Sequence, residues 1–291
     1  MRKSLVDTVG GLNEKFDGAQ DYDFVLRLTE NTKKIYHCPR ILYHWRCSNQ
    51  STAASQGNKM YAIHAGKAAL NAHYKRIGWN ARAQEGAVDG WYQTKFTLKE
   101  EPLVSILIPN KDHTDDLDVC LNSFFERADY QNYEFIIIEN NSVLPETFAY
   151  YEKIEKEHDN VKVVYWEAGF NYSAINNFGF KFAKGDYIML LNNDVELITP
   201  DIFQSMLGFC MRPEVGIVGA KLLYNDHTVQ HAGVLVGAGG LADHVFKGIH
   251  EDDPGYMGRA ISSQDVSAVT AACLLVKRSV YEEVGGLEEE F

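Results

Sequence analysis

The sequence predicts an α/β fold in which a mostly parallel sheet is flanked by helices. From residue 102 onward, apolar runs alternate with amphipathic segments, a pattern typical of right-handed parallel β-α-β units. The run Tyr187–Leu191 is apolar throughout, as expected of a parallel strand covered on both faces. The polar tip Asn192–Asp194 follows it directly, and ligands of open α/β sheets gather beyond the carboxyl ends of the strands.

The expected strands of this part share short apolar runs, and the expected helices share apolar residues at helical spacing. The strands cover Leu103–Pro109, Tyr133–Glu139, Val161–Trp166, Tyr187–Leu191, Val215–Ala220 and Ala268–Lys277. The helices cover Asp115–Arg127, Glu146–His158, Tyr172–Ala183, Pro200–Cys210 and Ser279–Val284. The Gly-rich stretch Gly237–Gly258 is expected to be a functional lid or a disordered loop, as long structureless loops in compact domains usually are.

The first hundred residues follow a less regular pattern of helices and short extended pieces. Helices are expected at Lys3–Val9, Asp21–Glu30 and Lys59–Ile77, and extended pieces at Ile35–Cys38, Ile41–Trp45 and Trp91–Leu98.

Residues 3–16 and 278–291 form an internal repeat. Seven of the fourteen positions are identical, including a Gly-Gly pair and the final Phe. A chance match between two short helices that end in Gly-Gly is the weaker explanation, because the final Phe is shared as well. The repeat favours a chain assembled from the tail of one module and the head of the next.

Composition narrows the classes of partner. The net charge of −12 argues against a nucleic-acid partner, because no basic excess exists to neutralise phosphates. No apolar run is long enough for a transmembrane segment; the longest candidate, Val266–Val276, is interrupted by Ser267 and Thr270. The five cysteines are scattered without CxxC spacing, which favours reduced thiols in a cytoplasmic protein.

Several short motifs occur along the chain and together resemble one family. They are Gln20–Asp23, Tyr43–Arg46 with Ser51 and Thr52, Val104–Asp112, Ile136–Ser142, Leu190–Asp194, Val229–Gly233 and Ser267–Lys277. This set resembles the family 2 glycosyltransferases, which have the GT-A fold, and most closely the tandem enzymes that build bacterial cell-surface polysaccharides. Ile136–Ser142 is similar to the nucleoside-binding strand end, Leu190–Asp194 to the DxD motif, and Gln20–Asp23 to the motif that holds the catalytic base.

The resemblance implies a metal-dependent, inverting hexosyl- or deoxyhexosyltransferase. The donor would be a nucleoside-diphosphate sugar, and the acceptor a glycan or lipid-linked glycan. Residues 1–52 would be the C-terminal tail of a preceding module, residues 53–101 a helical linker, and residues 102–291 the N-terminal nucleotide-sugar-binding part of a GT-A domain. The protein would act in the cytoplasm, or peripherally at the inner face of the membrane.

Two other functions compete with this interpretation. One is a non-catalytic module that binds nucleotide sugar or glycan within a larger assembly. The other is a nucleotidyltransferase, which would require a Gly-rich phosphate loop where Asn110–His113 stands.

The resemblance also assigns roles to particular residues. Asp21 is the expected base that takes the proton of the acceptor hydroxyl. Asp194 is expected to ligate Mn²⁺ or Mg²⁺, with His44 as a further ligand, and the ion offsets the charge of the leaving diphosphate. The remaining expected residues bind substrate: Pro109, Lys111, Glu139, Asn141, Asn192, Asn193 and His231.

Each of these residue types also has a structural use. Asp21 could be a first-turn helix charge, and His44 a core histidine. Glu139 could be a strand-end carboxylate that faces water, Lys111 a solvated lysine, and His231 a residue packed beneath the Gly-rich loop.

The chain departs from the family pattern in three ways. Asn192 stands where the motif has an aspartate, and Gln20 replaces the acid that precedes the base position Asp21. Asp21 and His44 also precede Asp194, although the family has them after it. Residues 1–52 would therefore complete the domain as a permuted single fold, or the tail of one molecule would complete the head of another in a swapped homodimer. The repeat argues against a seamless permutation, because its two copies compete for one place.

Overall fold

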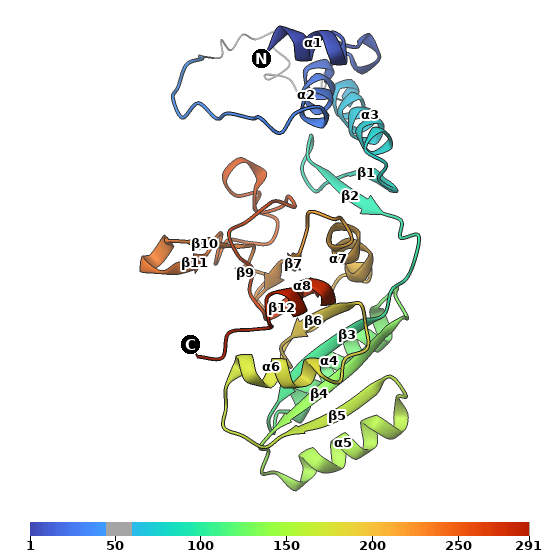
Figure 1. Cartoon of the computed structure of the whole chain (residues 1–291), viewed down its shortest axis with the longest axis vertical. Coiled ribbons are helices and arrows are strands. Elements are labelled where there is room, and N and C mark those ends of the chain that lie inside the picture. The colour runs from blue at the N-terminus through green and yellow to red at the C-terminus, as the bar shows by residue number, and fades with distance from the viewer. Residues whose placement is uncertain (45–59, 291) are drawn as a thin grey trace. The chain divides into compact units, whose positions relative to one another are not determined.

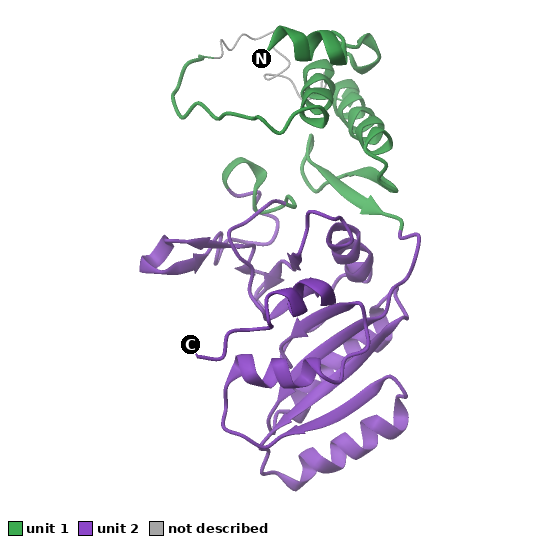
Figure 2. Ribbon diagram, in the orientation of Figure 1, with its two compact units in different colours: residues 1–97, 256–263 green, residues 98–255, 264–291 purple. Residues whose placement is uncertain are grey.

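The structure is a computed structural model that describes residues 1–44 and 60–290. It divides into two compact units (Figure 2). Unit 1 comprises residues 1–97 and 256–263, and unit 2 comprises residues 98–255 and 264–291. The division into modules at residues 52 and 101 remains a prediction.

Unit 2 is built around a six-stranded sheet with the order β5-β4-β3-β6-β12-β7 (Figure 1). Strands β3, β4, β5 and β6 are parallel to their neighbours in this group, whereas β12 runs antiparallel to both β6 and β7. The strands are β3 (Val104–Asn110), β4 (Tyr133–Asn140), β5 (Val161–Trp166), β6 (Tyr187–Leu191), β7 (Ile217–Gly219) and β12 (Cys273–Lys277). The predicted fold class, a mostly parallel sheet flanked by helices, is confirmed.

Helices cover both faces of this sheet. Successive strand residues point to opposite faces, so neighbouring residues of one strand contact different helices. Ile106 belongs to a cluster that packs against α4, α5 and α7, whereas Leu107 belongs to a cluster that packs against α6 and α8. The helices are α4 (Thr114–Arg127), α5 (Pro145–Glu157), α6 (Tyr172–Phe180), α7 (Ile202–Cys210) and α8 (Arg278–Glu283).

Three expectations for this part are corrected. Helix α6 ends at Phe180, before the expected Ala183, because the chain tightens into i+3 turns there. Strand β12 begins at Cys273, since Ala268 instead forms an isolated bridge to Val234. The Gly-rich stretch is not structureless: it contains part of a hairpin and two short 3-10 helices. The small elements here are β8 (Leu222–Leu223), β9 (Val229–His231), β10 (Val234–Val236), η3 (Ala238–Gly240), β11 (Ala242–His244) and η4 (Tyr256–Gly258).

Unit 1 is held together by α2 and α3 and by an antiparallel hairpin. A small core forms around Leu70, Tyr74 and Ala83. The elements are α1 (Lys3–Val9), η1 (Glu14–Phe16), α2 (Gln20–Glu30), α3 (Met60–Arg76), β1 (Ala81–Glu85) and β2 (Tyr92–Phe96). The hairpin partner β1 was missed because the segment Ala81–Glu85 lacks an apolar run.

The strand-like pieces expected at residues 35–38 and 41–44 are not strands. No partner strand lies beside them in the described chain, and their large apolar side chains are exposed. Trp45, Arg46, Ser51 and Thr52, which complete the expected closing His segment, lie outside the described residues.

Candidate functional site

Three neighbouring parallel strands end in polar side chains at the same edge of the sheet in unit 2. Strand β3 ends at Asn110, β4 at Asn140, and β6 leads into Asn193. Asn193 Nδ2 donates to Asn110 Oδ1 at 2.7 Å, which ties the tip after β6 to the end of β3. The tip expected to bind a metal is therefore anchored to the neighbouring strand.

The network continues from this tip to Glu139. Asn110 Nδ2 donates to Tyr151 Oη at 2.8 Å, and Tyr151 Oη donates to Glu139 Oε2 at 2.8 Å. Burial raises the pKa of the Tyr151 phenol, so it remains a donor at neutral pH. The strand ends of β6, β3 and β4 are thus joined through Tyr151 of α5, the helix that follows β4 in the chain.

Glu139 is buried rather than open to a ligand. Only 3% of the residue is exposed, and its carboxylate accepts from the Ser142 backbone N–H and, at 2.6 Å, from Ser142 Oγ. A buried carboxylate requires such partners to offset its lost hydration. The side chain therefore holds the β4–α5 loop in place, and it does not face water as the structural alternative supposed.

Asp112 was not singled out from the sequence, yet it joins two loops at this edge. Its carboxylate accepts from the backbone N–H groups of Val143 (2.9 Å) and Leu144 (3.0 Å) and from Thr147 Oγ1 (3.3 Å). These hydrogen bonds, with Leu144 the strongest, lower the pKa of the Asp112 carboxyl. Its φ of 57° is in the left-handed region, which Asp adopts more readily than most residues. An aspartate shortly after a strand that ends in Pro-Asn was the available signal.

Asn141 also has a left-handed backbone, with φ 57°, and its side chain is exposed. Its Nδ2 donates to the Ala168 carbonyl at 2.8 Å, which ties the end of β4 to the loop after β5. Pro109 is half-buried and Lys111 is exposed at the same edge. Pro109 thus lies at the end of β3, and Lys111 and Asn141 lie in the loops just beyond β3 and β4, where a bound nucleotide is expected.

The tip itself presents one carboxylate to solvent. The Asn192 backbone N–H donates to the Ala272 carbonyl at 3.0 Å, and Asn192 and Asn193 are half-buried. Asp194 is exposed and makes no hydrogen bond or ion pair within the described chain. Behind the tip, burial raises the pKa of the Cys120 thiol to about 12, and Cys273 and Asp194 add to this effect. Cys120 is therefore a protonated core residue and not a nucleophile.

His231 lies in the interior of unit 2. Its residue is 1% exposed, and its Nδ1 lies 3.0 Å from His244 Nδ1. Its Nε2 accepts from the Thr270 backbone N–H at 3.5 Å, so Nδ1 carries the hydrogen and donates to His244. Burial, with a smaller effect of His244, lowers the pKa of His231 to about 4. The ring is thus neutral and packed beneath the β10–β11 hairpin segment.

The expected base and the second expected metal ligand lie in unit 1. Asp21 is exposed in the first turn of α2, and His44 is exposed at the end of the first described range. The next acid along, Asp23, is fully buried and forms an ion pair with Arg27 at 2.8 Å. Asp21 is therefore the solvent-facing carboxylate of this motif, and Asp23 is structural.

The side chains of the described chain offer few ligands for a metal ion. Among residues 1–44 and 60–290, no group of three or more His, Cys, Asp or Glu side chains is arranged to hold a metal ion. Mg²⁺ is, however, usually held by one or two carboxylates together with substrate phosphates and water. The exposed and unpaired Asp194 fits an ion of that kind, which would share its ligands with a diphosphate.

Comparison with known sequences identifies the family. The chain belongs to glycosyl transferase family 2, because the sequence model of that family matches residues 105–285. The class of protein is thus a glycosyltransferase of the GT-A type, and the family indicated by the sequence motifs is confirmed.

Two curated relatives match almost the whole chain. The uncharacterized protein y4gI of Sinorhizobium fredii is 41% identical over 292 residues, which cover 98% of this chain and 32% of that protein. The O-antigen biosynthesis protein RfbC of Myxococcus xanthus is 38% identical over 292 residues, which cover 100% of this chain and 23% of that protein. The chain therefore spans less than a third of the length of either relative.

Solved structures show more distant likenesses. The mannosyltransferase PcManGT from Pyrobaculum calidifontis, in complex with GDP-Man and Mn²⁺, is 12% identical with a TM-score of 0.48, covering 79% of this chain and 58% of that chain. Residues 1–349 of S. aureus TarS, in complex with UDP-GlcNAc, are 18% identical with a TM-score of 0.38, covering 44% of this chain and 37% of that chain.

Within the described ranges, no helix is both long and apolar enough to cross a membrane.

Proposed function

We propose that this chain transfers a hexosyl or deoxyhexosyl group from a nucleoside-diphosphate sugar to a cell-surface polysaccharide, with a divalent metal and with inversion at the anomeric carbon. The observation that carries the proposal is the polar edge of the sheet in unit 2. There an exposed, unpaired Asp194 follows a buried strand and is anchored through Asn193 and Asn110 to the next strand. Family membership and a relative named for O-antigen biosynthesis support the same reaction class and acceptor.

The donor would lie across the loops beyond β3, β4 and β6. Asp194 would hold Mn²⁺ or Mg²⁺ together with the diphosphate, and the ion would supply compensation for the charge of the leaving group. Lys111, Pro109 and Asn141 would line the nucleotide, while Asn192 and Asn193 would shape the tip. Glu139 and His231 would act from behind as positioning residues, because both are buried and bonded within the protein.

The acceptor would be activated by Asp21. An exposed carboxylate can take the proton of a sugar hydroxyl as that oxygen attacks the anomeric carbon. Attack opposite the leaving diphosphate inverts the configuration. His44 would add a second protein ligand to the metal.

We also propose the module boundaries that the internal repeat suggests: a tail in residues 1–52, a linker in residues 53–101 and a donor-binding part in residues 102–291. Asp21 would then serve Asp194 within one molecule or across a swapped homodimer. Mixing Asp21→Asn with Asp194→Asn chains separates the two arrangements, since only the swapped dimer regains activity. Free thiols at Cys38, Cys120, Cys210 and Cys273 favour a reducing, cytoplasmic location, including the inner face of the membrane.

The direct test is a thermal-shift screen of UDP, GDP and dTDP with and without Mn²⁺. A ligand that binds the folded state alone raises apparent stability, by about 2.7 kcal/mol at one hundred times its Kd. We expect a Mn²⁺-dependent shift for one nucleotide, and its loss in Asp194→Asn. The matched control is Asp186→Asn, which removes the same charge just before the opposite end of β6.

The rate of sugar transfer tests the proposed role of Asp21 as the base. In Asp21→Asn we expect nucleotide binding to persist while transfer falls about 10²–10⁴-fold, the usual contribution of a general base. Nucleotide binding without any transfer by the wild type would favour a non-catalytic nucleotide-sugar-binding or glycan-binding module. A shift that survives Asp194→Asn would remove Asp194 from the metal site.

A further inference from the structure

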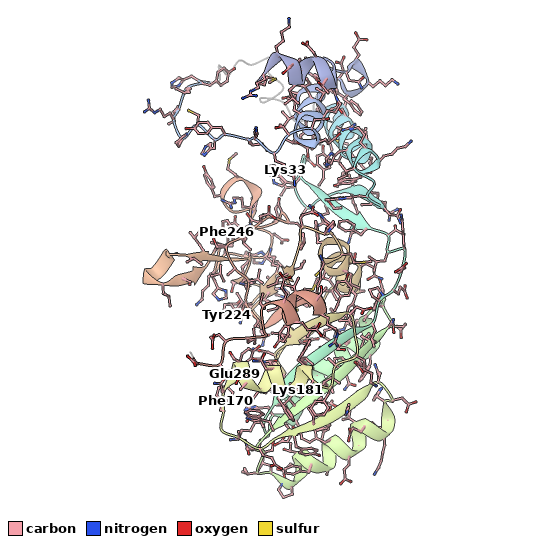
Figure 3. The ribbon with its side chains drawn as sticks, viewed as in Figure 1. Lys33, Phe170, Lys181, Tyr224, Phe246 and Glu289 are labelled. Atoms are coloured by element: carbon pink, nitrogen blue, oxygen red, sulfur yellow. The ribbon has the colours of Figure 1, made fainter. Side chains whose placement is uncertain are left out.

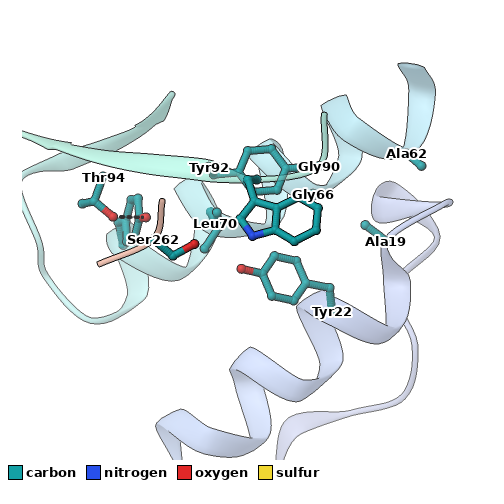
Figure 4. Close-up of a pocket in the computed structure, with 11 residues that line it drawn as sticks. Ala19, Tyr22, Ala62, Gly66, Leu70, Gly90, Tyr92, Thr94 and Ser262 are labelled. Carbon is teal, nitrogen blue, oxygen red and sulfur yellow. Dashed lines mark hydrogen bonds between the residues drawn. The ribbon is translucent and has the colours of Figure 1, made fainter. Parts of the chain in front are cut away.

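Unit 1 contains a pocket of about 500 Å³ that none of the proposed catalytic residues lines (Figure 4). This volume lies within the range of about 300–1,000 Å³ typical of small-molecule sites. Every residue that lines it is uncharged: Ala19, Tyr22, Ala62, Gly66, Leu70, Tyr74, Gly90, Trp91, Tyr92, Thr94 and Ser262.

Two of its aromatic side chains are fixed by the protein. Tyr74 Oη shares a hydrogen bond of 2.8 Å with Thr94 Oγ1, and Tyr92 Oη donates to the Ile63 carbonyl at 2.7 Å. Because their hydroxyls are engaged, these residues offer apolar ring surface in a set orientation. Figure 4 shows the rings of Tyr22 from α2 and Tyr92 from β2 at the pocket.

Three polar groups at the pocket have no partner within the described chain: the Tyr22 hydroxyl, the Trp91 indole N–H and the Ser262 hydroxyl. Burial raises the pKa of Tyr22 to about 12, so its hydroxyl keeps its proton at neutral pH. The pocket therefore combines aromatic walls with uncharged hydrogen-bonding groups, all three of which can donate.

The wall at Trp91 depends on a glycine that is distant in the sequence. A Cβ placed on Gly258, whose φ is +70°, would overlap the Trp91 indole. Only a residue without a side chain lets the segment 256–263 approach this ring, and the same segment brings Ser262 to the pocket. The pocket is thus a built feature of unit 1.

From this chemistry we infer that the pocket binds a neutral sugar ring of the acceptor glycan. Without a basic side chain, it is unsuited to a phosphate or a nucleotide. A sugar ring presents an apolar C–H face to aromatic walls and hydroxyls to polar tips, as amphipathic Tyr and Trp side chains accommodate. The assignment of this ring to the acceptor rests on the proposed function. It agrees with the sequence position of Tyr22, which directly follows Asp21, the proposed base for the acceptor hydroxyl.

The inference is tested on the full chain without a donor. Saturation-transfer NMR is recorded with the methyl glycosides of mannose, rhamnose and glucose, and with glucuronate and tetramethylammonium as charged comparisons. We expect transfer to the ring C–H protons of at least one neutral glycoside. Its binding should be about tenfold weaker in Trp91→Ala and in Tyr22→Ala, since stacking on one aromatic ring is usually worth that much or more.

Control variants distinguish the contribution of the Tyr22 ring from that of its hydroxyl, and both from a loss of folding. Tyr22→Phe keeps the ring and should lose less than Tyr22→Ala, and Tyr36→Ala, at a tyrosine that is 89% exposed, should bind as the wild type does. If Trp91→Ala unfolds, Tyr22→Ala decides, because Tyr22 is 38% exposed. The inference is overturned if no neutral glycoside binds, if Tyr22→Ala binds like the wild type, or if either charged comparison binds better. Mn²⁺-dependent nucleotide shifts in these variants report the donor site separately, so its failure is told apart from that of the pocket.

Discussion

The two copies of the internal repeat share a local conformation but differ in what surrounds them. Both form a short helix that ends before a glycine with a left-handed backbone, Gly10 with φ 80° and Gly285 with φ 81°. In unit 2, Tyr281 is buried, and Val280 and Leu287 pack with it on the sheet. In unit 1, α1 contains no buried residue, and Leu12, the counterpart of Leu287, is 62% exposed. The same motif is therefore a core element in one unit and a surface element in the other.

The contacts that hold each copy also differ. In unit 2, Asn177 Oδ1 accepts from the Leu287 backbone N–H (2.9 Å) and Tyr281 Oη (2.7 Å), and Glu289 lies beside α6 through a bond from Asn177 Nδ2 of 2.8 Å (Figure 3). In unit 1, Arg27 donates to the carbonyl of Val9 at 2.6 Å, and the buried Asp23 orients that arginine. The second copy is held both by packing on the sheet and by hydrogen bonds with Asn177, whereas the first copy is held by hydrogen bonds from Arg27 to its backbone carbonyls.

The largest difference between the copies should appear on truncating their equivalent apolar positions. Tyr281→Ala removes a fully packed ring that stacks on Phe180, with centroids 4.5 Å apart, and should lower the free energy of unfolding by about 3–5 kcal/mol. Val6→Ala, at the same position of the first copy, should change it by less than about 1 kcal/mol. Urea unfolding measures both. Equal costs would show that the first copy is packed as tightly as the second.

As the pH falls, the folded state of unit 2 should lose stability at a higher pH than that of unit 1. The pKa of His231 is about 4 in the folded chain and 6.5 in the unfolded chain, so the unfolded state binds the extra proton as the pH falls between these values. Stability is then lost from pH 6.5 downward, by about 3 kcal/mol in all. In unit 1, burial alone would raise the pKa of Glu30, but hydrogen bonds from Arg76 and His73 lower it below the ordinary value of 4.5, so the stability that Glu30 contributes is lost only below that pH.

Urea unfolding of wild type and His231→Gln at a series of pH values checks this order. The variant should be less sensitive to pH between 6.5 and 4, whatever its stability at neutral pH. An identical slope in both chains would mean that His231 does not titrate in this window.

The smallest expected difference in stability is between alanine substitutions in the two Gly-Gly pairs. Gly286 has φ +83°, and a Cβ there would overlap Asn177 Oδ1, so Gly286→Ala should cost about 2 kcal/mol from backbone strain and disturbed hydrogen bonds. Gly11 has no left-handed φ and no atom within 4 Å of a Cβ, so Gly11→Ala should stay within about 0.5 kcal/mol. Thermal unfolding of the two variants provides the comparison, and a cost at Gly11 equal to that at Gly286 would contradict it.

Sequence patterns located most of the sheet in unit 2. Strands β5 and β6 begin and end at the predicted residues, because each is a short, mainly apolar segment bounded by polar residues. The partner strand β1 in unit 1 was missed, since its residues alternate weakly and, within the described residues, pair with β2 alone. The edge of the sheet that carries Asp194 and Asn193 was also predicted, but the burial of Glu139 and the role of Asp112 were not. The inward bonds of Glu139 require α5 to fold back on β4, and Asp112 bonds to a loop 31 residues further along the chain.

The sequence by itself determined the α/β fold class, the family and the helical conformation of both repeat copies, because these follow from local spacing and short motifs. Only the tertiary structure decided that Tyr281 is core while Val6 is not, that Glu139 bonds inward to Tyr151 and Ser142, and that residues 256–263 complete a pocket with Trp91. The physical reason is that burial and hydrogen-bond partners depend on segments distant along the chain, whereas helix, strand and turn preferences are set within a few residues.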